Sequence, residues 1–204
     1  MIDGYSDHGR PVSTSLGWAA LSSPGMEHVI ASVGPARITA DSQLILAEED
    51  LASAGYRLEC DAAWRFIRLD VTVTKASGSS RLSLSVDEDG HWRSDDTVLP
   101  ALEGCIDIDI SGTPFTNTLP IRRLTWPPGA VHDLDVAYVS LPDLSVTPHR
   151  QRYTLLAGGE ARGEAVYRYE SGTYRADLRV DGDGFVIGYP GLWDRVWPTV
   201  SRPS

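Results

Sequence analysis

The sequence predicts a mainly antiparallel β protein with one hydrophobic core. Short runs of alternating apolar and polar residues recur along the chain, and turn-forming residues separate them at short intervals, as is typical of antiparallel strands. The chain has 204 residues, of which 42% are hydrophobic, and this is enough for one domain with a sizeable core. The predicted strands are, in order, His28–Val33, Ala36–Leu46, Tyr56–Glu59, Trp64–Thr74, Arg81–Asp87, Cys105–Ile110, Val131–Tyr138, Gln151–Leu156, Ala165–Glu170, Tyr174–Val180 and Phe185–Tyr189.

The two ends of the chain and one internal segment carry weaker signals. The residues up to Pro24 are rich in glycine, serine and proline, so we expect a poorly ordered tail over residues 1–17. The domain is expected over residues 18–198, with a short tail over 199–204. The segment Ser42–Ala54 stays open between strand and helix, because the glycine that follows it would suit a helix C-cap.

Two Asp-Gly pairs predict hairpins. Asp89-Gly90 and Asp183-Gly184 each stand between predicted strands, and Asp-Gly tolerates the positive φ angles of a type I′ turn. A calcium loop is the alternative for the second pair and its neighbours. An EF-hand loop needs a glutamate six residues after its glycine, however, and the chain has Pro190 there. We therefore predict turns and no metal site.

The charge of the chain excludes several partners. It has 28 acidic and 18 basic residues and a net charge of −10, so we exclude nucleic acids and expect no broad adsorption to anionic membranes. No apolar run approaches the ~20 residues that span a bilayer, and Met1–Pro11 lacks the apolar region of a signal peptide. A cytoplasmic location is therefore expected, in which Cys60 and Cys105 would be free buried thiols.

Common enzyme motifs are absent from the sequence. It has no nucleophile elbow, zinc-protease, phosphate-loop or dinucleotide-binding pattern, and its five histidines are scattered without ligand spacing. We therefore predict no catalytic residue and no cofactor. The alternative is an acid/base pair, because Asp107 and Asp109 lie two residues apart in a predicted strand and share one face. The simpler interpretation of this face is the solvent-exposed side of a half-buried sheet.

The string "DIDISGTPFTNTLPIRRL", which begins at Asp107, predicts an ordered loop after that strand. Its two prolines restrict the backbone, and its threonines and Asn117 can bond neighbouring backbone groups. We expect Phe115 and Leu119 to pin the loop to the core. The adjacent Arg122 and Arg123 suit a phosphate, a carboxylate or a sugar hydroxyl, or form bidentate clamps with the two aspartates. Neighbours point in different directions, so we predict that Arg122 faces a ligand while the other arginine braces the loop.

The C-terminal string "GYPGLWDRVWP" gathers aromatic and polar residues. Tyr189 and Trp193 offer aromatic faces, and Arg195 lies beside them in sequence. Aromatic faces with planar polar partners are a common arrangement for holding sugars. A hydrophobic plug that closes one end of a barrel is an equal alternative.

These strings, together with "VAYVSLPDLSVTPHRQRYTLL" and "VDGDGFVIGYPGLWDR", resemble the bacterial putative glycolipid-binding family over roughly Trp18 to Arg195. The resemblance implies a single domain in which a long antiparallel sheet, with few short helices, curls into a barrel-like or half-barrel shape. The fold of that family is likened to the lipoprotein-localisation carriers, which hold acyl chains.

Three functional interpretations follow from the residues and the resemblance together. The first is an intracellular protein that holds a lipid or glycolipid in an apolar cavity, with Asn117, Arg122, Arg123, Tyr189, Trp193 and Arg195 as ligand-binding residues. The second is an enzyme that acts on a small lipid-like or sugar substrate through Asp107 and Asp109. The third is an interaction module with a filled core.

Overall fold

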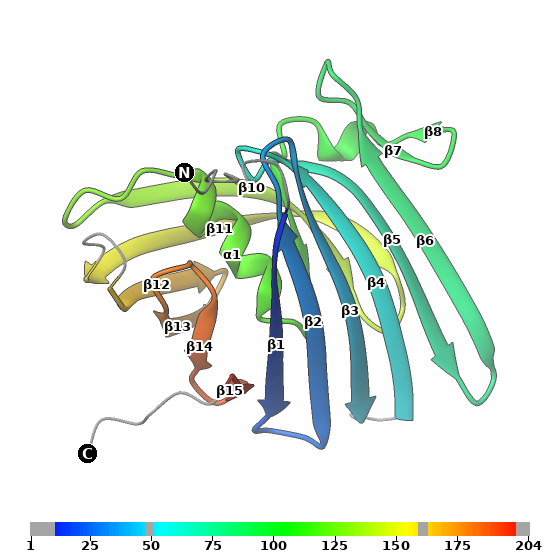
Figure 1. Ribbon diagram of the computed structural model, residues 1–204. Coiled ribbons are helices and arrows are strands. Elements are labelled where there is room, and N and C mark those ends of the chain that lie inside the picture. Colours follow the sequence, from blue (N-terminus) through cyan, green and yellow to red (C-terminus); the bar gives the residue numbers. More distant parts are fainter. Residues whose placement is uncertain (1–10, 48–50, 159–162, 199–204) are drawn as a thin grey trace, which may run out of the picture.

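The computed structural model describes residues 11–47, 51–158 and 163–198 (Figure 1). Its strands form one open sheet in the order β8-β7-β6-β5-β4-β3-β2-β1-β15-β14-β13-β12-β11-β10-β9. Neighbouring strands are antiparallel except β9 and β10, which are parallel. The predicted mainly β fold, curled as a half-barrel, is confirmed. The strands are β1 Val12–Ala20, β2 Gly25–Val33, β3 Arg37–Ala47, β4 Leu51–Asp61, β5 Phe66–Lys75, β6 Gly78–Val86, β7 Trp92–Ser94, β8 Thr97–Val98, β9 Asp107–Ile110, β10 Val131–Ser140, β11 Ser145–Ala157, β12 Ala165–Ser171, β13 Tyr174–Val180, β14 Val186–Tyr189 and β15 Trp193–Trp197.

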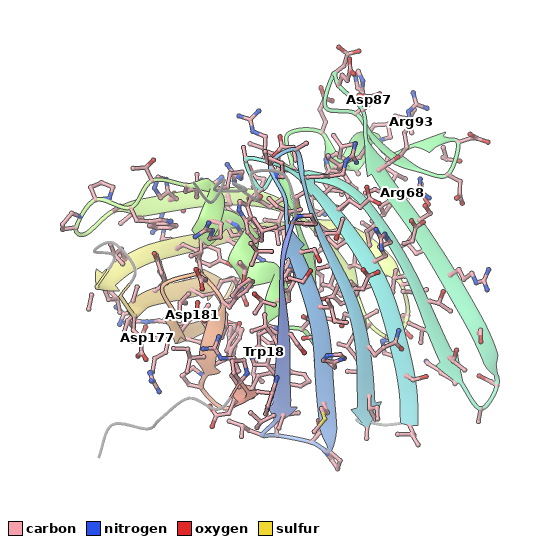
Figure 2. The ribbon with its side chains drawn as sticks, viewed as in Figure 1. Trp18, Arg68, Asp87, Arg93, Asp177 and Asp181 are labelled. Carbon is pink, nitrogen blue, oxygen red and sulfur yellow. The ribbon has the colours of Figure 1, made fainter. Side chains whose placement is uncertain are left out.

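The first and last strands join the two halves of the sheet. β1 pairs with β2 on one side and with β15 on the other, and Gly17 lies opposite Trp197. Trp18 of β1, which is labelled in Figure 2, is buried. It also donates a hydrogen bond from Nε1 to the Val186 carbonyl of β14, at 2.9 Å. The predicted tail over residues 1–17 is therefore wrong for residues 12–17, which belong to a central strand; residues 1–10 lie outside the described ranges.

The segment Ser42–Ala54, which the sequence left open, belongs to two strands. Its first part continues β3 and its last part begins β4, and the two pair in the register Ser42 opposite Tyr56. Residues 48–50 lie outside the described ranges. The prediction for the cysteines is confirmed, since Cys60 and Cys105 are both free and buried. Burial raises the pKa of each thiol, that of Cys105 to about 11.

The concave face of the sheet is covered by the segment that follows β9. Three short helices occur in the described residues: η1 (Pro100–Leu102), and then η2 (Phe115–Asn117) and α1 (Thr118–Arg123) in this segment. Figure 1 shows α1 between the arm that contains β1–β6 and the arm that contains β10–β14. As predicted, Phe115 and Leu119 are fully buried, together with Ile121. The curve of the half-barrel is thus occupied by the protein's own side chains.

Three hairpin turns share one construction. The carboxylates of Asp61, Asp87 and Asp181 each accept two backbone N–H groups, from residues two and four positions later, at 2.8–3.1 Å. The residue three positions later bonds back to the aspartate carbonyl and has a positive φ. That residue is Trp64 in the first turn and a glycine in the other two.

The turns at the two predicted Asp-Gly pairs are therefore confirmed, but the predicted type I′ geometry is wrong. That type needs a positive φ at Asp89 and Asp183. Trp64, Asp95 and Leu144 are the non-glycine residues with positive φ in the described ranges. Each turn is instead held by the side chain of the aspartate that opens it, Asp87 or Asp181, which accepts backbone N–H groups as an Asx turn.

Candidate functional site

A buried ion pair fixes the segment between β9 and β10. Arg123, at the end of α1, donates from Nε to Asp107 Oδ1 at 3.0 Å and from Nη2 to Oδ2 at 2.5 Å. The Asp107 side chain is 1% exposed and that of Arg123 is 11% exposed. Burial raises the pKa of Asp107, and the hydrogen bonds from Arg123 oppose that rise. This is the clamp that the sequence offered as one alternative, and it places Asp107 inside the protein rather than on a solvent-exposed face.

A second buried carboxylate holds the start of the same segment. Glu27 of β2 is 0% exposed and accepts hydrogen bonds from Ser42 of β3 at 2.8 Å and Tyr56 of β4 at 2.9 Å. The Thr113 hydroxyl bonds both carboxylate oxygens, at 2.8 and 2.6 Å. Burial raises the pKa of Glu27 to about 7 against the three hydroxyl donors. The Glu27 carboxylate therefore connects β2, β3 and β4 to the loop that precedes η2.

Asp109 has a different environment from Asp107. It is partly exposed, and it accepts hydrogen bonds from Thr116 at 2.8 Å and from Gln151 Nε2 at 2.6 Å. Desolvation raises the pKa of Asp109, and these two hydrogen bonds act against the rise. Asn117 is buried next to it and donates to the Tyr153 hydroxyl at 2.8 Å.

A groove runs past the loop at one end of the half-barrel, where β3 ends and β4 begins. It consists of three adjoining cavities that all share Gly112. We name them the lysine cavity (about 480 Å³, with Lys75), the tyrosine cavity (about 270 Å³, with Tyr169) and the proline cavity (about 170 Å³, with Pro24). Gly112 has a φ of +76°, and a Cβ there would lie 3.2 Å from Leu46 Cδ2. A larger residue would therefore be strained here and would crowd Leu46, which lines two of the three cavities.

The tyrosine cavity is the one with the most distinctive chemistry. The rings of Tyr169, Tyr174 and Tyr189, from β12, β13 and β14, form a triangle with centroid separations of 6.2–6.3 Å. Trp193 lines both the tyrosine cavity and the proline cavity. The lining also includes the polar residues Asp109, Ser111, Thr113, Asn117 and Ser171. Tyr138 and His149 also line it, and their rings stack at 4.3 Å with an interplanar angle of 8°.

The structure thus brings together four of the residues singled out from the sequence: Asp109, Asn117, Tyr189 and Trp193 all line the tyrosine cavity. The three arginines are not among its lining residues. Arg123 pairs with Asp107, and Arg195, whose side chain is 6% exposed, pairs with Asp181 at 2.5 Å. Of the two aspartates in the enzyme interpretation, only Asp109 reaches the cavity.

Arg122 is exposed and lies between two of the aspartate-based turns. Its guanidinium carbon is 5.5 Å from the centre of the Trp64 ring, in a cation–π arrangement. Its aliphatic stem lies next to Gly184, where an added Cβ would lie 2.5 Å from Arg122 Cδ. Of the neighbouring arginines, Arg123 is the one that braces the loop, as predicted, while the predicted ligand contact of Arg122 stays a prediction.

Replacement of Gly184 by alanine tests this contact. Gly90 and Gly184 occupy equivalent positions in two different turns of the same construction, and both have a φ of +86°. Nothing lies within 4 Å of a Cβ added at Gly90. Gly90→Ala should therefore cost only the left-handed strain, about 1 kcal/mol of unfolding free energy. Gly184→Ala should cost about 0.5–1 kcal/mol more, because Arg122 must leave Trp64. Urea unfolding measures both, and an Arg122→Ala background should remove the difference; a difference that persists there contradicts the contact.

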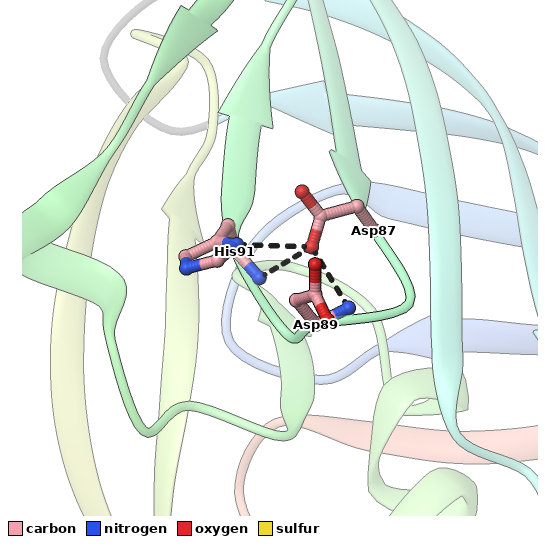
Figure 3. Close-up of side chains that lie close together, drawn as sticks. All are labelled: Asp87, Asp89 and His91. Carbon is pink, nitrogen blue, oxygen red and sulfur yellow. Dashed lines mark hydrogen bonds and ion pairs between the residues drawn. The ribbon is translucent and has the colours of Figure 1, made fainter.

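The turn at Asp87 also gathers three potential metal ligands (Figure 3). One ligand atom each from Asp87, Asp89 and His91 lies within 4.8 Å of the others. Asp87 Oδ1, however, already accepts the backbone N–H groups of both other residues. Asp89 and His91 are exposed, as is usual for a solvated hairpin turn. The arrangement is explained by the turn itself.

The sequence did not point to Glu27, Tyr169, Tyr174, Tyr138 or His149. Tyr169 and Tyr174 stand five residues apart on either side of a hairpin, which places them near each other only once β12 and β13 pair. Glu27 precedes a predicted strand and gave no signal of burial.

Together, the fold and the groove define an open half-barrel of one sheet with an aromatic groove at one end. A family model with the description "Putative glycolipid-binding" matches residues 15–195, and the chain belongs to this family. The chain is similar to the crystal structure of a DUF1089 family protein from Pseudomonas aeruginosa, with 33% sequence identity and a TM-score of 0.74. The match covers 96% of this chain and 100% of that protein's chain. No curated protein matches the chain. Within the described ranges, no helix has the length and apolar character needed to cross a membrane.

Proposed function

We propose that this protein binds a glycolipid at the groove, with the sugar in the tyrosine cavity. The observation that carries the proposal is the triangle of tyrosine rings beside the hydrogen-bonded carboxylate of Asp109. Small-ligand sites are typically concave, lined by aromatic side chains and equipped with a few placed polar groups. Aromatic faces accept the apolar faces of a sugar ring, and Asp109 and Asn117 supply partners for its hydroxyls. Membership of the glycolipid-binding family supports the same ligand class.

The lipid part of the ligand follows from the neighbouring cavities. Leu46 lines both the lysine and the proline cavities, and Leu192 and Trp193 line both the proline and the tyrosine cavities. These apolar side chains connect the sugar position to the outside, so the first part of an acyl chain would run along them. The interior of the curve is occupied by η2 and α1 with their buried side chains, so we place the ligand in the groove and not beneath the sheet.

Truncation of Tyr174 tests the proposal. Tyr174 is 40% exposed, so Tyr174→Ala should leave the thermal melt nearly unchanged, while the loss of one ring of the triangle weakens binding of dodecyl maltoside about ten-fold. Isothermal titration below the micelle concentration measures the affinity.

The matched control is Trp197→Ala. Trp197 is 60% exposed and is not among the residues that line the three cavities, so its truncation should leave the affinity unchanged. Native mass spectrometry of protein purified without detergent should in addition find a co-purified glycosylated lipid. If dodecyl maltoside does not bind, or if both variants bind it as the parent does, the groove is not the site.

A further inference from the structure

The tyrosine cavity contains one carboxylate and no lysine or arginine side chain among its lining residues. The carboxylate is that of Asp109. Gln151 and Thr116 hold the Asp109 carboxylate in place by donating to its two oxygens, and Tyr169 also bonds it. A carboxylate can accept about four hydrogen bonds, so it keeps capacity for a further one. The cavity therefore offers a ligand one carboxylate, tyrosine hydroxyls and the His149 imidazole, which is stacked on Tyr138, but no lysine or arginine.

The nearby cations are used elsewhere. Arg123 and Arg195 are buried and paired with Asp107 and Asp181, and Arg122 is held over Trp64. Lys75 lines the neighbouring lysine cavity and lies 3.7 Å from Asp143. An anionic headgroup in the tyrosine cavity would thus lie beside a carboxylate in a partly desolvated site with no lysine or arginine to pair with it, which is unfavourable.

We propose that the tyrosine cavity selects uncharged sugar headgroups and rejects phosphate, sulfate and uronate groups. This inference rests on the proposed function and deepens it, since it names the class of headgroup. The discrimination comes from Asp109, which accepts hydrogen bonds from sugar hydroxyls and repels anions. The tyrosine rings contribute to the affinity for both kinds of sugar, because a ring face is insensitive to a charge at the edge of the sugar.

The test compares two ligands that differ in one group. Dodecyl glucoside and dodecyl glucuronide share the tail and the sugar ring, and only the second carries a carboxylate. The full-length protein should bind the glucuronide at least about ten-fold more weakly at pH 8, and the difference should shrink at high salt. Dodecyl phosphate, which has no sugar, should bind more weakly still.

The outcomes separate the inference from the proposed function. Equal or tighter binding of the glucuronide or of dodecyl phosphate overturns the inference and leaves a lipid-binding groove standing. Failure of every ligand, the glucoside included, overturns the proposed function itself.

A variant of Asp109 tests whether this residue causes the difference in affinity between the glucoside and the glucuronide. Asp109→Asn keeps the size of the side chain and an acceptor oxygen, so the ratio of the two affinities should fall to about two-fold or less. Asp133→Asn is the control, because Asp133 is an ion-paired aspartate of β10 that is not among the lining residues of the groove. It should keep the parent's ratio. A ratio that Asp109→Asn leaves unchanged, in protein whose melt is intact, rules Asp109 out as the source.

Discussion

Replacement of Arg123 by methionine should lower the free energy of unfolding by about 3–5 kcal/mol, which is the usual cost of removing one partner from a buried ion pair. Methionine fills much of the space of the arginine stem but offers no donor to Asp107, whose side chain is 1% exposed. The aspartate must then remain charged without a partner or take up a proton, and both choices cost stability. Urea unfolding monitored by tryptophan fluorescence gives the free energy from the midpoint and slope.

The chain offers a matched control for this variant. Arg152 makes the same two-pronged contact with Asp133, at 2.8 and 3.0 Å, but the two side chains are 52% and 35% exposed. Arg152→Met should therefore cost less than about 1 kcal/mol, because solvent screens an exposed pair. Equal losses in the two variants would mean that burial does not set the cost of the Arg123 replacement.

A double variant separates the effect of losing the ion pair from the effect of changing the side-chain volume at Asp107 and Arg123. Asp107→Leu combined with Arg123→Met removes both charges and should recover most of the stability lost in the single variant, because no unpaired charge remains. The recovered protein should still bind dodecyl maltoside, since neither residue lines the tyrosine cavity. Loss of binding in a stable double variant would show that the ion pair positions the groove.

The regular strands could be predicted from the sequence because their signal is local. Strands such as β12 and β13 alternate buried positions with more exposed ones at a period of two, and a turn signal ends each of them. β1 escaped prediction for the opposite reason. Serine, threonine, glycine and alanine make up most of it around Leu16 and Trp18, so the alternation is weak. It is a strand because β2 and β15 flank it, and β15 lies at the other end of the chain.

At the site too, local sequence patterns could predict only part of the Asp107–Arg123 ion pair and of the groove. That Asp107 and Arg123 pair could be proposed from their closeness in sequence, but the choice between Arg122 and Arg123 depends on the phase of a single short helix. Tyr169, Tyr174 and Tyr189 come from three different strands, and their convergence depends on the pairing register and on the curl of the sheet. Neither quantity is written in a local pattern.

Glu27→Gln should weaken the pH dependence of stability. The pKa of Glu27 is raised to about 7 in the folded protein from 4.5, its ordinary value, which we take for the unfolded chain. Between these two pH values the folded protein holds a proton that the unfolded chain has released, so the free energy of unfolding falls as the pH rises. One pKa unit corresponds to about 1.4 kcal/mol, so this group costs the parent protein about 3 kcal/mol above pH 7. Glutamine cannot ionise and should escape that cost.

The comparison of parent and variant isolates Glu27 from the other buried acids. Burial also raises the pKa of Asp107 and of Asp109, and both therefore contribute to the pH dependence with the same sign in parent and variant. At pH 5 the two proteins should unfold at similar urea concentrations, because glutamine resembles the protonated acid in size. At pH 8.5 the variant should be more stable by about 2–3 kcal/mol. Parallel curves over this range would mean that Glu27 is ionised throughout, held by its hydroxyl donors alone.

The same titration bears on the groove, because Thr113 connects the two. Its hydroxyl accepts the Phe115 N–H at 3.0 Å and bonds Glu27, and the residue lines the tyrosine cavity. A hydroxyl has one proton, so Thr113 can donate to the ionised carboxylate or accept from the protonated one while it keeps its bond to Phe115. Both states therefore hold the loop in place, and dodecyl maltoside affinity should differ by less than about two-fold between parent and Glu27→Gln at pH 8.5. A larger difference would show that the charge of Glu27 reaches the ligand through Thr113.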